Sequence, residues 1–381
     1  MIVNPLDVDA LQAELCHCQC HSRLVFGSLA VNVHSNAAII LDQLSDYYKS
    51  YRQDSVTEHE VDLYVIEQAE PAESLDWQEV PREAGKQGKK EGYLDAESGR
   101  WIKKFKTGML MLQRQKDPVV VGPCLQNIAQ IINFINNQFI NVHLCRGYLL
   151  GHASGFSVQG KVTAIAAGSG GGKSTLMLRC LEDPQRQFLT NDRILMQASN
   201  SGANNAGANN SGANNAGANT GVNAVGVAKL PRVNPGTLLH SERLKHILPV
   251  DQQLELRQLT QQALWVLEQK YDVQIEDQYG PDRVQLQGEL TTLLMLDWSL
   301  DSTEPTRLER VNLEDEPQAI EGLRKRPGPF FQDTAGAFAD LNACATLETY
   351  CALLKGVRVF RLVGLIDFDK AFDLIAQLES L

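Results

Sequence analysis

The sequence contains no long hydrophobic run and none of the features of an export signal. Among its 381 residues, no stretch approaches the roughly 18 consecutive apolar residues that a membrane span needs. The opening segment, MIVNPLDVDALQAEL, has neither a basic start nor a long apolar core. We therefore expect no signal peptide and no membrane partner.

Positive charge and cysteine are also scarce. Lysine and arginine total 35 against 46 aspartates and glutamates, which gives a net charge of −11. This balance argues against a general nucleic-acid binder, because such proteins present basic surfaces to the phosphate backbone. The eight cysteines are too few for a disulfide framework in a chain of this length, so we expect reduced thiols.

A cysteine- and histidine-rich segment, CHCQCH, covers residues 16–21. Cys16, Cys18 and Cys20 alternate along the chain, which places them on one face of an extended segment. Structural zinc sites generally use two separated pairs of ligands, and the second pair is missing here. The sequence favours ordinary residues near the start of a strand, and adventitious or regulatory metal binding is the alternative.

The most informative stretch covers residues 162–179 and reads VTAIAAGSGGGKSTLMLR. Its apolar start, residues 162–166, predicts a buried strand. A glycine-rich turn follows, and a helix with periodic apolar residues is expected from Lys173 onward. Strand, glycine-rich loop and helix in this order are the pattern of a P-loop, although Ala167 replaces the first glycine of the motif.

Phosphate and magnesium are the ligands that this pattern predicts. Loop amides and the positive end of the helix converge on one point, which suits an anion. Lys173 reaches the β- and γ-phosphates of a nucleotide, and the Ser174 hydroxyl is placed for Mg²⁺. We therefore expect ATP and Mg²⁺ as cofactors. The predicted nucleotide-binding residues are Gly168, Ser169, Gly170, Gly171, Gly172, Lys173, Ser174 and Thr175.

Two acidic residues interrupt or end apolar segments. Residues 188–196 predict an apolar strand that contains Asn191 and Asp192. Polar groups in a central strand are costly unless they are used, so Asp192 is a candidate magnesium ligand or general base. Residues 290–298 predict a second apolar strand that includes Asp297. This shape is similar to a Walker B element, and a strand ending at an Asp turn is the alternative.

The remaining pattern predicts two domains. Before residue 144 we expect a smaller α+β domain, covering residues 1–143. Its predicted strands are 24–33, 61–66 and 101–112, with a turn at 95–99 and helices at 37–51 and 124–141. After it, alternating strands and helices predict an α/β domain with parallel strands, covering residues 144–381.

Within the second domain, residues 199–221 repeat Gly, Ala and Asn and predict a flexible insert that cannot form a core. Lys229 and Arg232 lie in a turn-rich segment and are candidates for contacts with phosphoryl oxygens. An exposed turn without such contacts is the alternative. Polar helices are expected over 237–290. A helix at 337–354, a last strand at 357–365 and a last helix at 369–378 complete the prediction.

These motifs resemble HPr kinase/phosphorylase and its relatives, most closely the HPr kinase-related kinases of type B. The pattern covers about residues 144–381, and the first domain is similar through GRWIKKFKTGM and NIAQIINFINNQ. The resemblance implies an HPr kinase/PEP carboxykinase-like P-loop domain. It also implies transfer of the γ-phosphoryl group of ATP to a Ser or Thr hydroxyl of a partner protein, with a small-molecule acceptor left open. A nucleotide site favours a cytoplasmic location, and the oligomers of the family imply a homo-oligomer.

The family also suggests roles for individual residues. His152 has the same distance to Gly-Lys-Ser as a histidine of HPr kinases, which supports a role at the site, with a structural histidine as the alternative. The position of the family's Asp-Asp pair is taken here by Asn191-Asp192, and the spacing from the P-loop to this pair is two residues longer than in the family. An amide cannot accept a proton as a carboxylate can. Thr175 stands where HPr kinases carry an acid. The predicted catalytic residues are Asp192, His152 and Lys173, and the predicted metal ligands are Ser174, Asp192 and Asp297.

The departure at Asn191 leaves several functions open. Asp192 takes over as base, or transfer is slow, or the protein only binds and hydrolyses nucleotide. A nucleotide-binding ATPase or a sensing module is therefore the alternative to a kinase. An ABC-type ATPase would suit SGGGKSTL, but the LSGGQ-like signature of that class is missing from the sequence.

Overall fold

The chain forms two compact units that are not contiguous in sequence. The computed structural model describes residues 8–51, 57–71, 75–81, 88–168, 170–199, 221–267 and 269–379. Residues 1–147 group with 326–344 in the first unit, and residues 148–325 group with 345–381 in the second. The predicted domain boundary at residue 144 stays a prediction, but the segment 326–344 groups with the first unit, whereas we expected it in the second domain.

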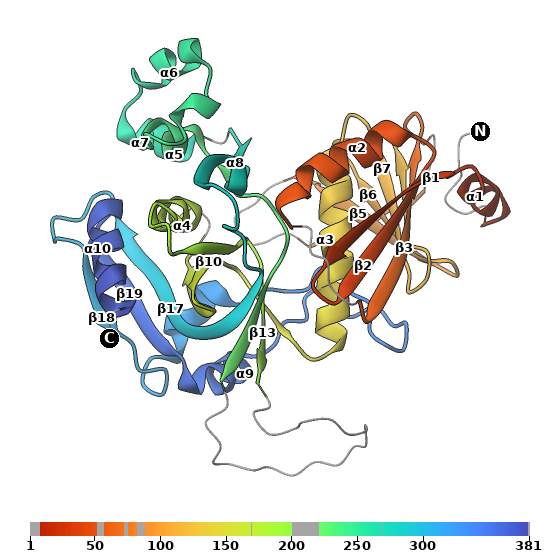
Figure 1. The fold of residues 1–381 in the computed structure, drawn as a ribbon. Coiled ribbons are helices and arrows are strands. Elements are labelled where there is room, and N and C mark those ends of the chain that lie inside the picture. The colour runs from red at the N-terminus through yellow and green to blue at the C-terminus, as the bar shows by residue number, and fades with distance from the viewer. Residues whose placement is uncertain are drawn as a thin grey trace. The chain divides into compact units, whose positions relative to one another are not determined.

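The first unit is built on an eight-stranded mixed sheet (Figure 1). Its strand order is β1-β2-β3-β8-β7-β6-β5-β4, with β2, β3 and β8 parallel and the other pairs antiparallel. The strands are β1 (Cys20–Phe26), β2 (Leu29–Ser35), β3 (His59–Glu67), β4 (Gln78–Glu79), β5 (Glu91–Ala96), β6 (Gly99–Lys104), β7 (Met109–Gln113) and β8 (Val119–Gly122).

Helices cover both faces of this sheet. They are α1 (Val8–Leu15), α2 (Ala38–Tyr47), η1 (Lys49–Tyr51) and α3 (Ile128–Cys145). Helices α2 and α3 lie on one face, whereas α1 lies on the other, where Leu11 and Leu15 join a core that includes Trp101 (Figure 1). Helix α3 buries Ile131, Ile135 and Phe139, as its apolar period predicts, and it also buries polar residues outside that stripe, such as Asn136 and Asn141.

Two segments that were each predicted as one strand of this unit are in fact two antiparallel strands joined by a turn. The segment 24–33 reverses at Gly27, between β1 and β2. The segment 101–112 reverses between Lys104 and Met109, so that β6 and β7 pair antiparallel. In both cases apolar residues lie on each side of a short turn, and the hydrophobic pattern alone therefore did not reveal the reversal.

Residues 326–344 complete the first unit. Phe330 packs its ring against Phe134 of α3 with centroids 5.4 Å apart, and its carbonyl accepts a 2.7 Å hydrogen bond from Asn141. The guanidinium of Arg100, on β6, lies 4.3 Å from the ring centroid of Phe338. The helix predicted over 337–354 is therefore wrong in its first half, and only α9 (Leu347–Leu353) forms.

The second unit contains a nine-stranded sheet whose central strand is β17. On one side β17 pairs parallel with β11. On the other it pairs antiparallel with β14 near its start and parallel with β19 farther on. Its strands are β9 (Leu149–Gly151), β10 (Ala153–Val158), β11 (Lys161–Ala166), β12 (Gln187–Asn191), β13 (Ile194–Ala198), β14 (Val222–Gly226), β17 (Gln287–Ser299), β18 (Arg307–Arg310) and β19 (Arg358–Leu365).

Parallel strands covered by helices are confirmed for this unit, although most of its pairs are antiparallel. Helices α4 and α10 pack together on one face of the sheet, and η3 packs against β11 and β17 on the other, next to α9 (Figure 1). Their bounds, with that of η4, are α4 (Lys173–Cys180), η3 (Pro317–Leu323), η4 (Leu354–Gly356) and α10 (Phe368–Glu379).

The segment between β14 and β17 holds several short elements rather than long polar helices. They are β15 (Arg232–Val233), α5 (Pro235–Leu239), η2 (Lys245–Ile247), α6 (Val250–Leu256), α7 (Gln261–Val266), β16 (Tyr271–Asp272) and α8 (Ile275–Tyr279). The strand predicted over 188–196 is likewise two strands, because the chain leaves β12 after Asn191 and starts β13 at Ile194. Among the described residues, no helix is long and apolar enough to cross a membrane.

Candidate functional site

A glycine-rich loop joins β11 to α4, as the sequence predicts. Gly170 and Gly172 adopt φ of 79° and 89°, in the left-handed region that favours glycine. The first helical hydrogen bond runs from the Leu176 amide to the Gly172 carbonyl over 2.9 Å. The amides at the start of α4 therefore have no intrahelical acceptor, and the dipole favours an anion there. Ser169 lies outside the described residues.

Lys173 folds back onto this loop. Its Nζ donates hydrogen bonds of 3.0 Å to the carbonyls of Ala167 and Gly168. The hydroxyl of Ser154, on β10, donates a 3.0 Å bond to the Lys173 carbonyl and ties the start of α4 to the sheet. The ammonium group of Lys173 is therefore bound by the backbone of the loop itself.

Burial lowers the pKa of Lys173 to about 8, helped by the cations of Arg193 and Lys325 and opposed by Asp192. At neutral pH most of the lysine is still protonated. A bound polyphosphate would add negative charge beside it and raise its pKa again.

Asp192 lies between three basic groups. Its carboxylate oxygens are 3.3 Å from Arg193 Nη1, 3.3 Å from Lys229 Nζ and 3.6 Å from His152 Nε2. Burial alone would raise the pKa of Asp192, but Arg193, Lys229 and His152 outweigh it and hold the pKa well below its usual range. The carboxylate is therefore ionised at neutral pH.

His152 lies between β9 and β10 and is fixed through its backbone. Its amide donates a 2.7 Å hydrogen bond to the Leu323 carbonyl, and its imidazole is half-buried. Burial and the nearby Lys173 lower the pKa of His152 to about 4, against the opposing effect of Asp192. The imidazole is therefore neutral at pH 7, with one nitrogen able to donate and the other able to accept.

Asn191 ends β12, opposite Ser154 of β10. The residue is only 7% exposed. Its buried Oδ1 has no hydrogen-bond donor among the residues that the structure describes. An unpaired buried acceptor is costly, which makes it a place to expect a ligand donor.

A cavity of about 330 Å³ opens beside the loop, a volume in the usual range for small-ligand sites. Its lining includes the aromatic side chains Trp265 of α7 and Phe368 of α10. It also includes Gly170, Gly171, Gly172, Lys173, Ser174, Thr175, Arg232, Asn234, Thr237 and His240. Loop amides and aromatic rings therefore share one cavity.

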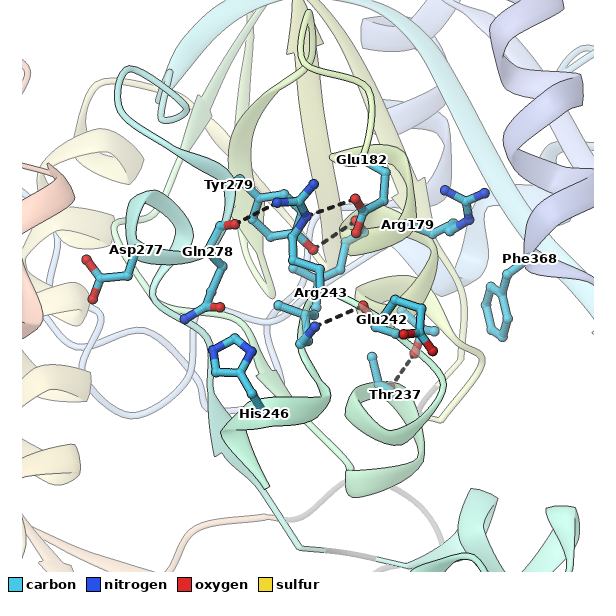
Figure 2. A pocket seen from close by; sticks show the side chains of 14 residues that line it. Arg179, Glu182, Thr237, Glu242, Arg243, His246, Asp277, Gln278, Tyr279 and Phe368 are labelled. Atoms are coloured by element: carbon cyan, nitrogen blue, oxygen red, sulfur yellow. Dashed lines mark hydrogen bonds and ion pairs between the residues drawn. The ribbon is translucent and has the colours of Figure 1, made fainter. Parts of the chain in front are cut away.

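A second, larger cavity of about 780 Å³ lies along α4 (Figure 2). Thr175, Thr237 and Phe368 line both cavities, and the two threonine hydroxyls are 2.7 Å apart. Figure 2 shows Arg243 bonded to the carboxylate of Glu182 at 2.9 Å and to the carbonyl of Gln278 at 3.0 Å.

The predicted site residues do not all come together. His152, Lys173, Asp192 and Lys229 form one cluster through the contacts and electrostatic effects described above. Asp297 is exposed on β17, two residues beyond Met295, which pairs with the last residue of β11. It is not among the residues lining either cavity, and its role as a metal ligand stays a prediction.

Magnesium would find suitable donors in part of this set. Mg²⁺ takes oxygen ligands, commonly one or two carboxylates together with substrate phosphates. The ionised Asp192 and the hydroxyl of Ser174 fit that chemistry. Among the described residues, no group of three or more His, Cys, Asp or Glu could hold a metal by itself, and Cys16, Cys18 and Cys20 are free thiols.

Sequence reasoning missed five residues of the site. Arg193 and Ser154 left no recognisable signal, because ordinary surface and strand residues carry the same letters. The aromatic residues were detectable in principle, since a lone tryptophan in a polar segment, or one directly after Asp297, is unusual. Those aromatic residues are Trp265 and Phe368, which line the cavity, and Trp298, whose indole donates a 3.1 Å hydrogen bond to the Gly171 carbonyl of the loop.

Comparisons with known proteins add little. No family model matches the chain, and no curated protein matches its sequence. Among solved structures, the HPr(Ser) kinase/phosphatase from Coxiella burnetii is similar at 10% identity, over 60% of this chain and 90% of that chain, with a TM-score of 0.28.

Proposed function

We propose that the chain is a P-loop phosphotransferase that moves the γ-phosphoryl group of Mg²⁺-bound ATP to a hydroxyl, most simply a Ser or Thr of a partner protein. One observation carries the proposal. The lysine that begins α4 lies within electrostatic reach of an ionised carboxylate, Asp192, and a neutral imidazole, His152. An anion cradle next to an acid–base pair is what phosphoryl transfer needs.

Phosphate binding would exchange one set of hydrogen bonds for another. Lys173 would release the carbonyls of Ala167 and Gly168 and donate to the β- and γ-phosphates, joined by the amides that begin α4. Bound Mg²⁺ supplies charge neutralisation on the phosphate oxygens. Ser174 and Asp192 are the side chains that would hold it.

Asp192 is a weak base while Lys229 and Arg193 compensate its charge. A bound triphosphate would draw on those two cations, and the pKa of Asp192 would then rise toward its usual value. The carboxylate could accept the proton of an incoming hydroxyl from that state.

A second function, nucleotide hydrolysis or nucleotide sensing without transfer, is favoured by Asn191 itself. Its amide occupies the position at which a second carboxylate would stand, and it cannot take up a proton. A site with one strongly compensated carboxylate would bind nucleotide well and transfer its phosphate slowly.

The test is incubation of the protein with γ-labelled ATP, Mg²⁺ and a cell lysate. We expect one labelled acceptor with wild type and with Lys161→Met, an exposed lysine at the start of β11 that serves as the matched control. Lys173→Met should label nothing, and its affinity for Mg²⁺-bound ATP by calorimetry should fall about 10- to 150-fold, the loss of a charge-assisted bond.

Three results are informative. Labelling that persists in Lys173→Met would overturn the assignment of the loop. Release of free phosphate with no labelled acceptor would indicate an ATPase. Retention of nucleotide with neither product would indicate a sensing module.

A further inference from the structure

The cavity beside the loop contains an aromatic pair that the phosphoryl chemistry does not use. The rings of Trp265 and Phe368 have centroids 6.5 Å apart and planes inclined by 23°. A Cβ on Gly172 would lie 3.2 Å from the Phe368 ring and 3.5 Å from the Trp265 ring. Both rings therefore lie next to the backbone that would cradle the phosphates.

The loop itself holds this pair in place. Trp298, on β17, donates a 3.1 Å hydrogen bond from its indole to the Gly171 carbonyl. The same indole meets Phe368 edge-on, with centroids 5.3 Å apart and planes at 83°. Phe368 is thus contacted on one side by a residue anchored on the loop, and it lines the cavity that Trp265 also lines.

A buried acceptor in the same cavity points to a ligand with N–H or O–H donors. Asn234, which precedes α5, has a buried Oδ1 with no donor among the described residues, and its side chain makes no cap hydrogen bond. An aromatic wall with an unpaired acceptor suits a nucleoside, whose base stacks and whose amine or ribose hydroxyls donate.

The larger cavity is a weaker candidate for binding the base of a nucleoside. Its charged side chains already pair with neighbours, Arg243 with Glu182 at 2.9 Å and Arg179 with Asp369 at 2.7 Å. An uncharged base cannot replace the charge interactions of these ion pairs, so binding there would not compensate for breaking them. Stacking on Trp265 and Phe368 breaks no ion pair.

We propose that Trp265 and Phe368 bind the base of the nucleotide, with Asn234 as an acceptor for one of its donors. This inference rests on the proposed function, because it assumes that the loop binds the triphosphate. It makes Trp265 a determinant of nucleoside affinity rather than of phosphate affinity. The two can be separated by comparing Mg²⁺-bound ATP with Mg²⁺-bound tripolyphosphate, which has the phosphates but no nucleoside.

The experiment measures both ligands by calorimetry on wild type, Trp265→Ala, Trp265→Phe and Val266→Ala, the last an exposed neighbour on α7. Trp265→Ala should lose about 5- to 150-fold in affinity for ATP, the value of one base–aromatic stack, and keep its affinity for tripolyphosphate. Trp265→Phe should recover most of the loss, and Val266→Ala should match wild type.

Tryptophan fluorescence gives a second measurement. ATP should quench the emission of wild type, tripolyphosphate should not, and the quench should disappear in Trp265→Phe. Equal losses for both ligands, or no loss for ATP, would overturn the base site while leaving the phosphate site intact. If wild type binds neither ligand, the proposed function fails and the base site fails with it.

Discussion

Asp192 is the proposed general base of the site, and its ionised carboxylate lies among basic side chains. In Asp192→Asn the charge disappears, and a positioned proton acceptor is worth about 10²- to 10⁴-fold in rate. We therefore expect phosphoryl transfer to fall by that factor, measured in single-turnover reactions, while a circular dichroism spectrum shows a folded chain. Unchanged transfer would show that Asp192 is not the base.

Asn191→Asp is the complementary variant. A carboxylate at Asn191 would place two acids next to each other, and repulsion would raise the pKa of one of them, which makes it a better base at neutral pH. We expect faster single-turnover transfer than in wild type. No gain would mean that the asparagine is suited to a different reaction.

His152 makes stability depend on pH. Its pKa is about 4 in the folded chain against a usual 6.5, so between these values the unfolded chain binds a proton that the folded chain does not. The free energy of unfolding therefore has the full contribution of His152 above pH 6.5. This contribution falls as the pH approaches 4, by at most about 1.4 kcal/mol per pH unit. Because the side chain is 23% exposed, solvent screening makes the slope smaller.

The measurement is urea unfolding of wild type and His152→Gln at pH 5 and pH 7. The variant should lose less stability than wild type on going to pH 5. An identical loss in both proteins would contradict the low pKa of His152.

Some site residues were predictable from the sequence because they belong to a local motif. Lys173 and Ser174 follow directly from the glycine-rich stretch, and the break at Asn191-Asp192 was visible as polar residues inside an apolar segment. Arg193 directly follows Asp192 but has no signal of its own. Trp265 is unusual as an isolated tryptophan in a polar segment, but its place beside the loop, like that of Phe368, depends on tertiary folding and could not be predicted.

At the level of elements, the stability of the loop between β11 and α4 should depend more on Gly172 than on Gly168. Gly172 has φ of 89° and lies against Phe368, so an added Cβ costs about 1–2 kcal/mol in backbone strain and also meets the ring. Gly172→Ala should lower the melting temperature by about 2–8 °C. The check is a thermal scan without nucleotide.

Gly168→Ala is the matched control for this scan. The φ of Gly168 is outside the left-handed region, and an added Cβ would have no heavy atom within 4 Å. Its melting temperature should equal or slightly exceed that of wild type. Equal losses in both variants would mean that the loop, and not the conformation at Gly172, is sensitive to any side chain.

Element type was easier to predict than the points at which elements end. The apolar stripe of α3 and the strand before the loop were recognised because each has a clear period. The reversal at Gly27 was not, since one long apolar segment and two short strands look alike in sequence. Strand pairing around β17, with three partners, lies beyond any local pattern.

For the whole molecule, the informative residue is Phe330, which lies far along the chain but belongs to the first unit. It is 5% exposed and packs against Phe134 of α3. Phe330→Ala should cost about 3–5 kcal/mol, as removal of a buried phenyl ring does. Hydrogen exchange should therefore rise in peptides from α3 and β6, which contact residues 326–344.

A matched measurement follows peptides from β11 and α4 in the same experiment. They belong to the second unit, and their exchange should change much less. Equal increases in both sets would mean that the two units unfold together. No increase in α3 would show that Phe330 contributes little to the first unit.

The split of the first unit also affects how the protein is made. Residues 326–344 are translated about 200 residues after Gly147, about 10–40 s later at ordinary rates of synthesis. Until they leave the ribosome, Phe134 has no Phe330 to pack against. The opening 147 residues therefore gain these contacts only after most of the chain has been synthesised, and a premature stop codon before residue 326 would leave the first unit without them.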